Sequence, residues 1–99
     1  MEIKKRIQKY VLNIAGSKQN IDVGGAMPTV LTVAEQNGKL TMWVELEEDY
    51  PGSFNIDIDV IATGQQYETQ GKYVGTAIMS NDEEWHVFAN KNYIRVDEV

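Results

Sequence analysis

The sequence contains no cysteine, only two prolines and a single histidine. Without cysteine the chain can form no disulfide, no thiolate nucleophile and no thiolate metal site. It also has no apolar run that approaches the roughly 20 residues of a membrane-spanning helix. The first ten residues, MEIKKRIQKY, are positively charged but lack the apolar stretch and cleavage site of a secretory signal. We therefore expect a protein of a reducing cytoplasm that makes no membrane contact.

Positive charge is also scarce, because nine lysines and arginines stand against fifteen aspartates and glutamates and the net charge is −6. This balance argues against general binding to the phosphates of duplex nucleic acid. The two signs are segregated: bases gather at Lys4, Lys5, Arg6, Lys9 and Lys18, and carboxylates at Glu45, Glu47, Glu48, Asp49, Asp57 and Asp59. Either the two groups neutralise one another on neighbouring strands, or the basic segment forms an edge for an anionic partner.

Length and composition fit one globular domain. The 99 residues can bury one hydrophobic core but not two, and a hydrophobic share of 42% argues against a disordered chain. No internal repeat, low-complexity tract or linker divides the sequence. We expect a single domain over residues 1–99, in which residues 90–99 form a tail or a late edge strand.

The clearest structural signal is the segment 29–46, TVLTVAEQNGKLTMWVEL, in which two alternating runs flank Asn37-Gly38. A two-residue hairpin loop needs positive φ at both central positions, which asparagine tolerates and glycine adopts freely. Counting outward from this turn pairs Gln36 with Lys39, Val33 with Met42, Leu31 with Val44 and Thr32 with Trp43. The same register predicts four residues on the buried face: Leu40, Met42, Val44 and Leu46. Trp43 then lies on the opposite face.

The rest of the chain also favours strands. Alternation and β-branched content predict them at 3–14, 20–23, 54–60, 72–79 and 84–89, although the first segment also matches helical spacing. Turns are expected at Gly16-Ser17, at Gly24-Gly25 with the Met27-Pro28 step, and at 47–53, 63–71 and 80–83. Seven short runs without a convincing amphipathic helix predict an all-β fold, a small antiparallel β-sandwich or barrel of about seven short strands.

No residue set in the sequence predicts catalysis. His86 has no nucleophile or orienting acid placed around it by spacing, and a zinc site would need carboxylates for all its other ligands. Asp57 and Asp59 share a strand face about 6–7 Å apart, which suits a glycosidase pair or a cation, but we expect them to be solvated charges. We therefore expect no catalytic residues, no metal and no cofactor, and a packed or partner-facing His86.

Other features indicate a ligand site. Trp43, on the polar face of its strand, either covers a second small core or contacts a partner. Trp85 and His86 belong to a run with apolar bulk on both faces, which predicts a central strand. The loop 62–75, ATGQQYETQGKYVG, combines glycines, amides, hydroxyls and two tyrosines, which suits a small polar ligand but also an ordinary hairpin loop. The predicted ligand-binding residues are Trp43, Thr63, Gly64, Gln65, Tyr73, Trp85 and His86.

The order of short motifs resembles a family of small uncharacterised proteins from tailed bacteriophages. The motifs are Gln36-Asn37-Gly38, Trp43, Thr63-Gly64, Tyr73-Val74-Gly75 and Trp85 to Phe88, and the resemblance covers about residues 6–89. Members often have a histidine after the Thr-Gly step, where this chain has Gln65. They also tend to stop soon after the last motif, whereas this chain continues to Val99.

This resemblance implies an accessory phage protein that acts in the cytoplasm of an infected host bacterium. We expect a non-enzymatic homo-oligomer that counters immune defence by binding and sequestering a small nucleotide signal. Aromatic rings would stack on the base, and Lys72 or Arg6 would meet phosphate. The alternatives are an inhibitor that binds a host or defence protein through the acidic segment 45–59, or a minor structural phage protein.

Overall fold

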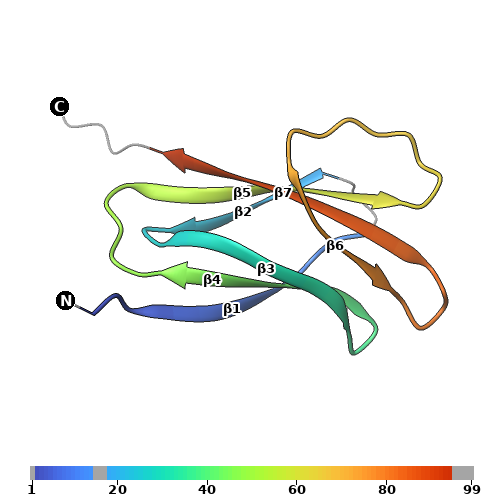
Figure 1. Cartoon of the computed structure of the whole chain (residues 1–99), viewed down its shortest axis with the longest axis horizontal. Helices are drawn as coiled ribbons and strands as arrows, with labels where there is room; N and C mark the ends of the chain where they lie inside the picture. The colour runs from blue at the N-terminus through green and yellow to red at the C-terminus, as the bar shows by residue number, and fades with distance from the viewer. Residues whose placement is uncertain (1, 15–17, 95–99) are drawn as a thin grey trace.

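The computed structural model describes residues 2–14 and 18–94, and every regular element in them is a β-strand. The strands are β1 (Lys5–Val11), β2 (Lys18–Gly24), β3 (Met27–Gln36), β4 (Lys39–Glu47), β5 (Ser53–Ala62), β6 (Lys72–Ile78) and β7 (Glu84–Ile94). They form two antiparallel sheets, one in the order β1-β4-β3 and one in the order β2-β5-β7-β6 (Figure 1). The prediction of an all-β sandwich with about seven strands is confirmed. Within the described ranges, no helix is long and apolar enough to cross a membrane.

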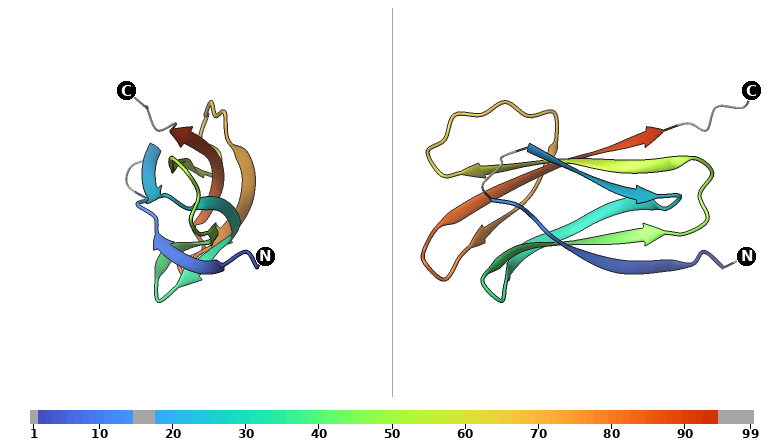
Figure 2. Two further views of the ribbon diagram at one scale, coloured as in Figure 1. Left: turned by 90° about the vertical axis from the view of Figure 1, so that its left-hand side faces the viewer. Right: turned by 180° about the vertical axis from the view of Figure 1, so that it is seen from behind.

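The two sheets pack face to face around one core. Seen end-on, the three-stranded and four-stranded sheets form opposite walls, and β3 lies beside β6 where the walls meet (Figure 2). Buried side chains from both sheets fill the space between them: Leu12, Ala26, Val33, Leu40, Met42, Val44, Leu46, Ile56, Ile58, Val60, Ala77, Met79, Val87 and Ala89. Alternating inward and outward side chains therefore give each sheet one buried face.

The β3–β4 hairpin carries the register that the Asn-Gly turn predicts. Asn37 and Gly38 have φ of 53° and 77°, and Gln36 pairs with Lys39. The four residues predicted to face inward are at most 1% exposed: Leu40, Met42, Val44 and Leu46. Trp43 pairs with Thr32 on the opposite face, also as predicted. A tight turn and strict alternation are enough to set both faces of this hairpin.

One pair of this hairpin differs from the prediction. The register shifts between Val30 and Thr32, so Val30 lies opposite Val44, and Leu31 is 44% exposed. The prediction that Leu31 faces Val44 is therefore wrong. A β-bulge inserts one extra residue into one strand, and beyond it every pairing moves by one position. The shift turns Pro28 toward the core, where it lies opposite Leu46 and is buried.

The N-terminal half of β3 also departs from expectation. Strand β3 begins at Met27, so the Met27-Pro28 step does not interrupt the pairing with β4. Proline lacks an N–H donor, but β3 is an edge strand and its other side needs no partner. The turn expected at Gly16-Ser17 lies outside the described residues.

Strands β5 and β7 form the centre of the four-stranded sheet. Phe54, Ile56, Ile58 and Val60 alternate as buried residues along β5, as predicted, and β7 is a central strand. Strand β7 does not end at Ala89, because its pairing with β5 continues to Ile94 opposite Ser53. Residues 90–94 are thus the end of a central strand, and 95–99 lie outside the described part of the chain.

The segregated charges meet across neighbouring strands. The basic strand β1 pairs antiparallel with β4, and Lys5 Nζ lies 3.5 Å from Glu45 Oε1. Arg6 forms an ion pair with Glu48 on the same side of the molecule. On the other sheet, Lys18 Nζ lies 3.0 Å from Asp59 Oδ1. These pairs favour mutual neutralisation, the first of the two interpretations of the charge pattern.

Candidate functional site

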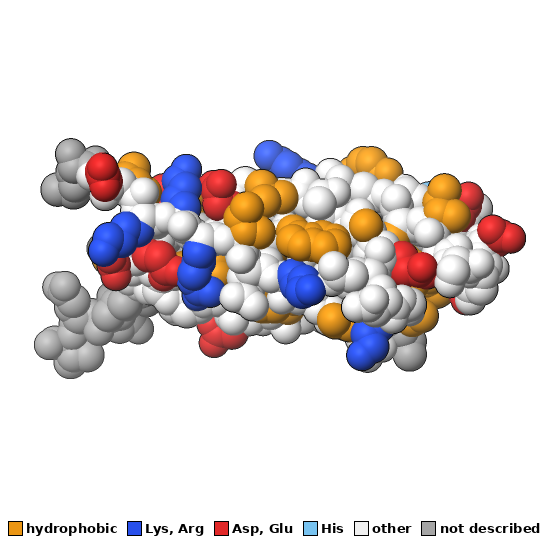
Figure 3. All heavy atoms as spheres, turned by 90° about the horizontal axis from the view of Figure 1, so that it is seen from below, with side chains coloured by type: hydrophobic (Ala, Val, Ile, Leu, Met, Phe, Trp, Pro, Cys, Tyr) orange, Lys and Arg blue, Asp and Glu red, His pale blue; other side chains and the backbone are white. Residues whose placement is uncertain are grey.

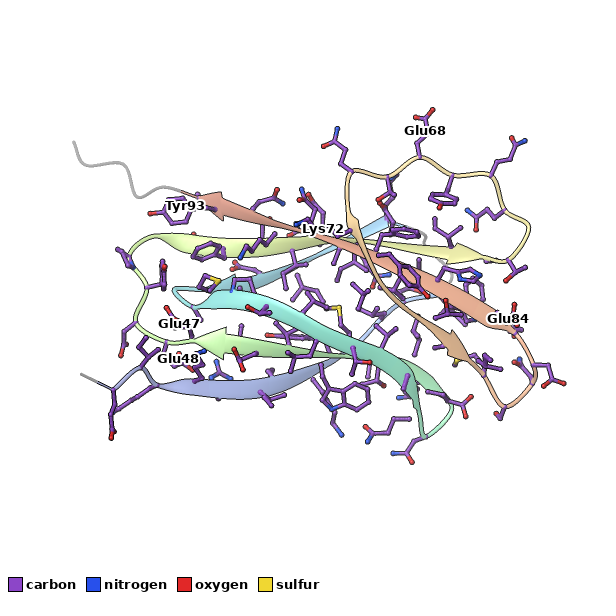
Figure 4. The ribbon with its side chains drawn as sticks, viewed as in Figure 1. Glu47, Glu48, Glu68, Lys72, Glu84 and Tyr93 are labelled. Atoms are coloured by element: carbon purple, nitrogen blue, oxygen red, sulfur yellow. The ribbon has the colours of Figure 1, made fainter. Side chains whose placement is uncertain are left out.

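The loop at residues 63–71 crosses the outer face of the four-stranded sheet. It connects β5 to β6, which lie on either side of β7, and forms the arch visible beside Glu68 in Figure 4. Gln65 closes its first turn, because the Gln65 amide N–H donates to the Ala62 carbonyl and the Gln65 side chain accepts from the Ala62 N–H. Gly64 occupies that turn with φ of 88°. Two of the predicted site residues thus shape the start of the arch.

The end of the arch is held against the sheet. Thr69 donates a hydrogen bond to Asp59 and accepts one from the Gly71 N–H at 2.9 Å. A Cβ at Gly71 would lie 2.8 Å from the backbone nitrogen of Ala89, so only glycine allows the chain to approach β7 this closely. The arch is therefore anchored at both ends.

An open hollow of about 450 Å³ lies between the start of this arch and strands β6 and β7. Its lining residues are Ile61, Ala62, Thr63, Gly64, Gln65, Tyr67, Tyr73, Thr76, His86 and Phe88. Five of the predicted ligand-binding residues are among them: Thr63, Gly64, Gln65, Tyr73 and His86. We call this hollow the His86 pocket.

A directional chain of hydrogen bonds forms the polar side of the pocket. Thr63 Oγ1 donates to Glu84 Oε1 at 2.8 Å, so its oxygen is left to accept from His86 Nε2–H at 2.7 Å. His86 Nδ1 then accepts from Thr76 Oγ1 at 2.8 Å, and Thr76 accepts from the Tyr73 hydroxyl at 2.6 Å. Because a carboxylate can only accept, Glu84 sets the direction of the whole chain and the tautomer of the imidazole.

Aromatic rings form the other side. The rings of Tyr67 and Phe88 lie 5.2 Å apart between centroids, and those of Tyr73 and Phe88 lie 5.6 Å apart. The two tyrosines are 50% and 59% exposed, so each presents a ring face or edge to solvent. No lysine or arginine is among the residues that line this pocket. The pocket suits a flat, uncharged ring with polar edges better than it suits a phosphate.

The two tryptophans do not belong to this pocket. Trp43 lies on the outer face of the other sheet, where it pairs with Lys9 of β1 and Thr32 of β3. Trp85 alternates with Val87 and packs against the core, and its Nε1 is buried without a hydrogen-bond partner among the described residues. The site prediction therefore joins residues from three separate places in the fold.

Sequence reasoning also missed lining residues of the pocket. Tyr67 lies in the predicted loop but carries no motif, and Thr76 looks like an ordinary strand residue. Phe88 lies two residues beyond His86 on the same strand face, and this spacing is the one sequence feature that indicates Phe88 as a neighbour of the site. Thr76 is revealed only by the β6–β7 register, which places it opposite His86.

A second hollow of about 760 Å³ lies over β2 and β5, beside residues 68–71. Asp57 on its floor accepts hydrogen bonds from the side-chain amides of Asn20 at 2.8 Å and Asn92 at 2.7 Å. Hydrogen bonding to Asn20 and Asn92, together with the charge of Lys18, holds the pKa of the Asp57 carboxyl below its ordinary value of 3.8. Asp57 and Asp59 are thus each bonded to other side chains of the sheet and its arch.

We expect the double substitution Asn20→Ala with Asn92→Ala to raise the pKa of Asp57 toward 3.8. A lowered pKa in the folded state adds stability above the unfolded value, and that stability is lost as pH falls through the folded value. The wild type should therefore lose more stability than the variant on acidification below about pH 4. NMR titration of the carboxyl carbon measures the pKa of Asp57, and urea midpoints as a function of pH measure the stability. As a control, Asn81→Ala, in the turn after β6, should leave the Asp57 titration unchanged.

No group of three or more histidine, cysteine, aspartate or glutamate side chains in residues 2–14 and 18–94 is arranged to hold a metal ion.

The comparisons with known proteins give one match. No curated protein and no solved structure matches this chain. A family described as a domain of unknown function, DUF7352, matches residues 3–96, which is nearly the whole sequence. The chain therefore belongs to the DUF7352 family.

Proposed function

We propose that this protein is a non-enzymatic phage accessory protein that binds a small nucleotide signal in the host cytoplasm and so blunts bacterial immune defence. One observation carries the proposal: the exposed rings of Tyr67 and Tyr73 stand beside the polar chain centred on His86 in one open pocket. A nucleobase is a flat ring with hydrogen-bonding edges, and stacking on an aromatic side chain contributes about 1–3 kcal/mol per base.

The charges around the pocket decide which part of the ligand it holds. Glu84 is joined to the hydrogen-bond chain, and no lysine or arginine lines the pocket. The base or nucleoside part of the ligand therefore occupies the pocket, and its phosphates point to solvent. Lys72 adjoins Tyr73 in sequence and is exposed, but Lys72 pairs with Ala89 whereas Tyr73 pairs with Phe88, so alternation turns the two side chains to opposite faces of β6 and Lys72 does not point into the pocket. Arg6 serves another purpose, because it pairs with Glu48 on the other sheet.

The test is calorimetry and thermal shift with a panel of cyclic mononucleotides and cyclic oligonucleotides, together with adenosine and guanosine. We expect heat and a raised Tm for at least one nucleotide, and weaker binding of the matching nucleoside that shares its base. No heat and no Tm shift across the panel would end the proposal. The ligand should also be recovered unchanged by chromatography after incubation, and conversion to a product would contradict the non-enzymatic part.

The alternative, binding of a host or defence protein through the acidic segment 45–59, has less support. Three of the six carboxylates in this segment, Glu45, Glu48 and Asp59, form ion pairs with Lys5, Arg6 and Lys18. Pairing half of these charges within the chain weakens the attraction of the segment for a basic partner.

A further inference from the structure

The outer faces of the two sheets differ in kind. The outer face of the four-stranded sheet is crossed by the arch, whereas the outer face of the three-stranded sheet is uncovered within the described residues. Figure 3 looks onto this second face and shows apolar side chains gathered at its centre among charged ones. The β-strand registers identify the apolar residues as Ile7 and Val11 of β1, Trp43 of β4 and Ala34 of β3. We call this surface the Trp43 face.

Large apolar side chains on this face are exposed to an unusual degree. Ile7 is 61% exposed and Val11 is 60% exposed. Trp43 is half-buried between the neighbouring strands. Burial of apolar surface contributes about 25 cal/mol per Å², so these side chains gain from a covering partner.

The order of residues along the strands shows which partner fits. Trp43 pairs with Lys9, and the apolar pair of β1, Ile7 and Val11, lies two residues to either side of Lys9. On β4, Glu47 and Lys39 lie four residues to either side of Trp43, about 13 Å away at the strand rise. Strand β4 therefore carries opposite charges at equal distances from the centre of the face, while Lys5 of β1, which lies opposite Glu47, is paired with Glu45.

Two copies can meet face to face across a two-fold axis that lies in the plane of the Trp43 face, perpendicular to the strands, at the level of Trp43. This arrangement matches the charge order of β4. It places Ile7 of one copy over Val11 of the other, twice, and stacks the two Trp43 side chains at the axis. It also places Glu47 over the Lys39 of the other copy, twice. A two-fold axis along the strands would instead set each of these charges against its own copy, which is repulsive. Of these two orientations, only the first sets Glu47 against Lys39.

One like-charged pair remains in this arrangement, because Lys9 would lie over its own copy. Strand β1 is an edge strand, so the long Lys9 side chain can extend past the edge into water. Lys9 Nζ bonds Gln36 Oε1 at 2.7 Å in the single chain, and that bond would be exchanged for hydration.

We propose that the protein forms a two-fold dimer through the Trp43 face, with Glu47 of each copy paired to Lys39 of the other. Three strands about 4.8 Å apart and some 30 Å long give a contact well below the roughly 800 Å² per partner of a standard interface, so the dimer is weak. The His86 pocket lies on the opposite sheet and stays open in both copies. The dimer therefore presents two separate pockets.

Sedimentation velocity over a concentration series tests the dimer with charge-swapped variants. Glu47→Lys and Lys39→Glu, each alone, set like charges against each other, and we expect dimer formation to weaken by about tenfold or more for each. Mixing the two variants in equal amounts should restore association, because each copy then carries the charges that complement the other. The double variant, Glu47→Lys with Lys39→Glu, should also dimerise by itself.

The rescue separates this interface from a general loss of folding. If the wild type stays monomeric at every concentration, or if the mixed variants associate no better than either one alone, the proposal is overturned. Trp43→Ala should abolish the dimer, while nucleotide binding at the His86 pocket should persist. A ligand that binds a strictly monomeric wild type would therefore overturn the dimer and leave the proposed function standing.

Discussion

Replacing Ile58 with alanine is expected to lower the free energy of unfolding by about 2–5 kcal/mol. Ile58 lies at the middle of β5, a central strand of the four-stranded sheet, and its side chain is 1% exposed in the core. Removing three buried methyl or methylene groups loses their transfer free energy and leaves a cavity that the close-packed sandwich fills only in part. A domain of this size has a total stability of about 5–15 kcal/mol, so the variant should lose a large share of it.

The chain offers a matched control for this substitution. Ile78 at the end of β6 is 65% exposed, and Ile78→Ala should change the free energy of unfolding by no more than about 0.5 kcal/mol. Urea denaturation followed by far-UV circular dichroism measures both variants against the wild type. Equal effects at the two positions would show that the two sheets do not enclose the core described above.

The hairpin shows how much of the fold the sequence determines locally. Asn37-Gly38 sets the turn, alternation sets the faces, and the two together place Leu40 to Leu46 correctly without any long-range information. The same alternation finds β5, because every second residue from Phe54 to Val60 is buried. Short-range chemistry is sufficient wherever one strand face is fully buried.

The errors come from long-range effects. The β3 bulge places Pro28 opposite Leu46 and Val30 opposite Val44, and no local pattern indicates it. Strand β7 extends past Ala89 because Asn90 and Asn92 lie on the outer face, where they hydrogen-bond each other and Asn92 bonds the side chains of β5. Polar residues that look like the end of a strand are there part of a side-chain network across the sheet.

The sequence predicts part of the candidate site. Thr63, Gly64, Gln65, Tyr73 and His86 come together because loop and strand are close in the fold, and the composition of the loop indicated a polar ligand. Trp43 was correctly placed off the core, but which sheet carries the pocket depends on strand order. The strand order β2-β5-β7-β6, with β7 between the two strands that the arch connects, is not encoded in any single segment.

Replacing Tyr73 with alanine is expected to weaken nucleotide binding by about 10- to 100-fold, since each lost base stack costs about 1–3 kcal/mol. Tyr73 is 59% exposed, contacts Phe88 and lies at one end of the hydrogen-bond chain through His86. Tyr73→Phe keeps the ring and removes only the hydroxyl, so it should retain most of the affinity. The pair of variants separates stacking from hydrogen bonding, and calorimetry measures both.

A tyrosine at the far end of the same sheet provides the control. Tyr93 packs against Phe54 and donates to the Pro51 carbonyl, away from the pocket, so Tyr93→Ala should bind nucleotide as the wild type does. If Tyr73→Ala and Tyr93→Ala lose affinity equally, the loss reflects the stability of the sheet and the pocket is in the wrong place. If Tyr73→Phe binds as poorly as Tyr73→Ala, the hydroxyl and its link to Thr76 hold the ligand, and the ring face does not.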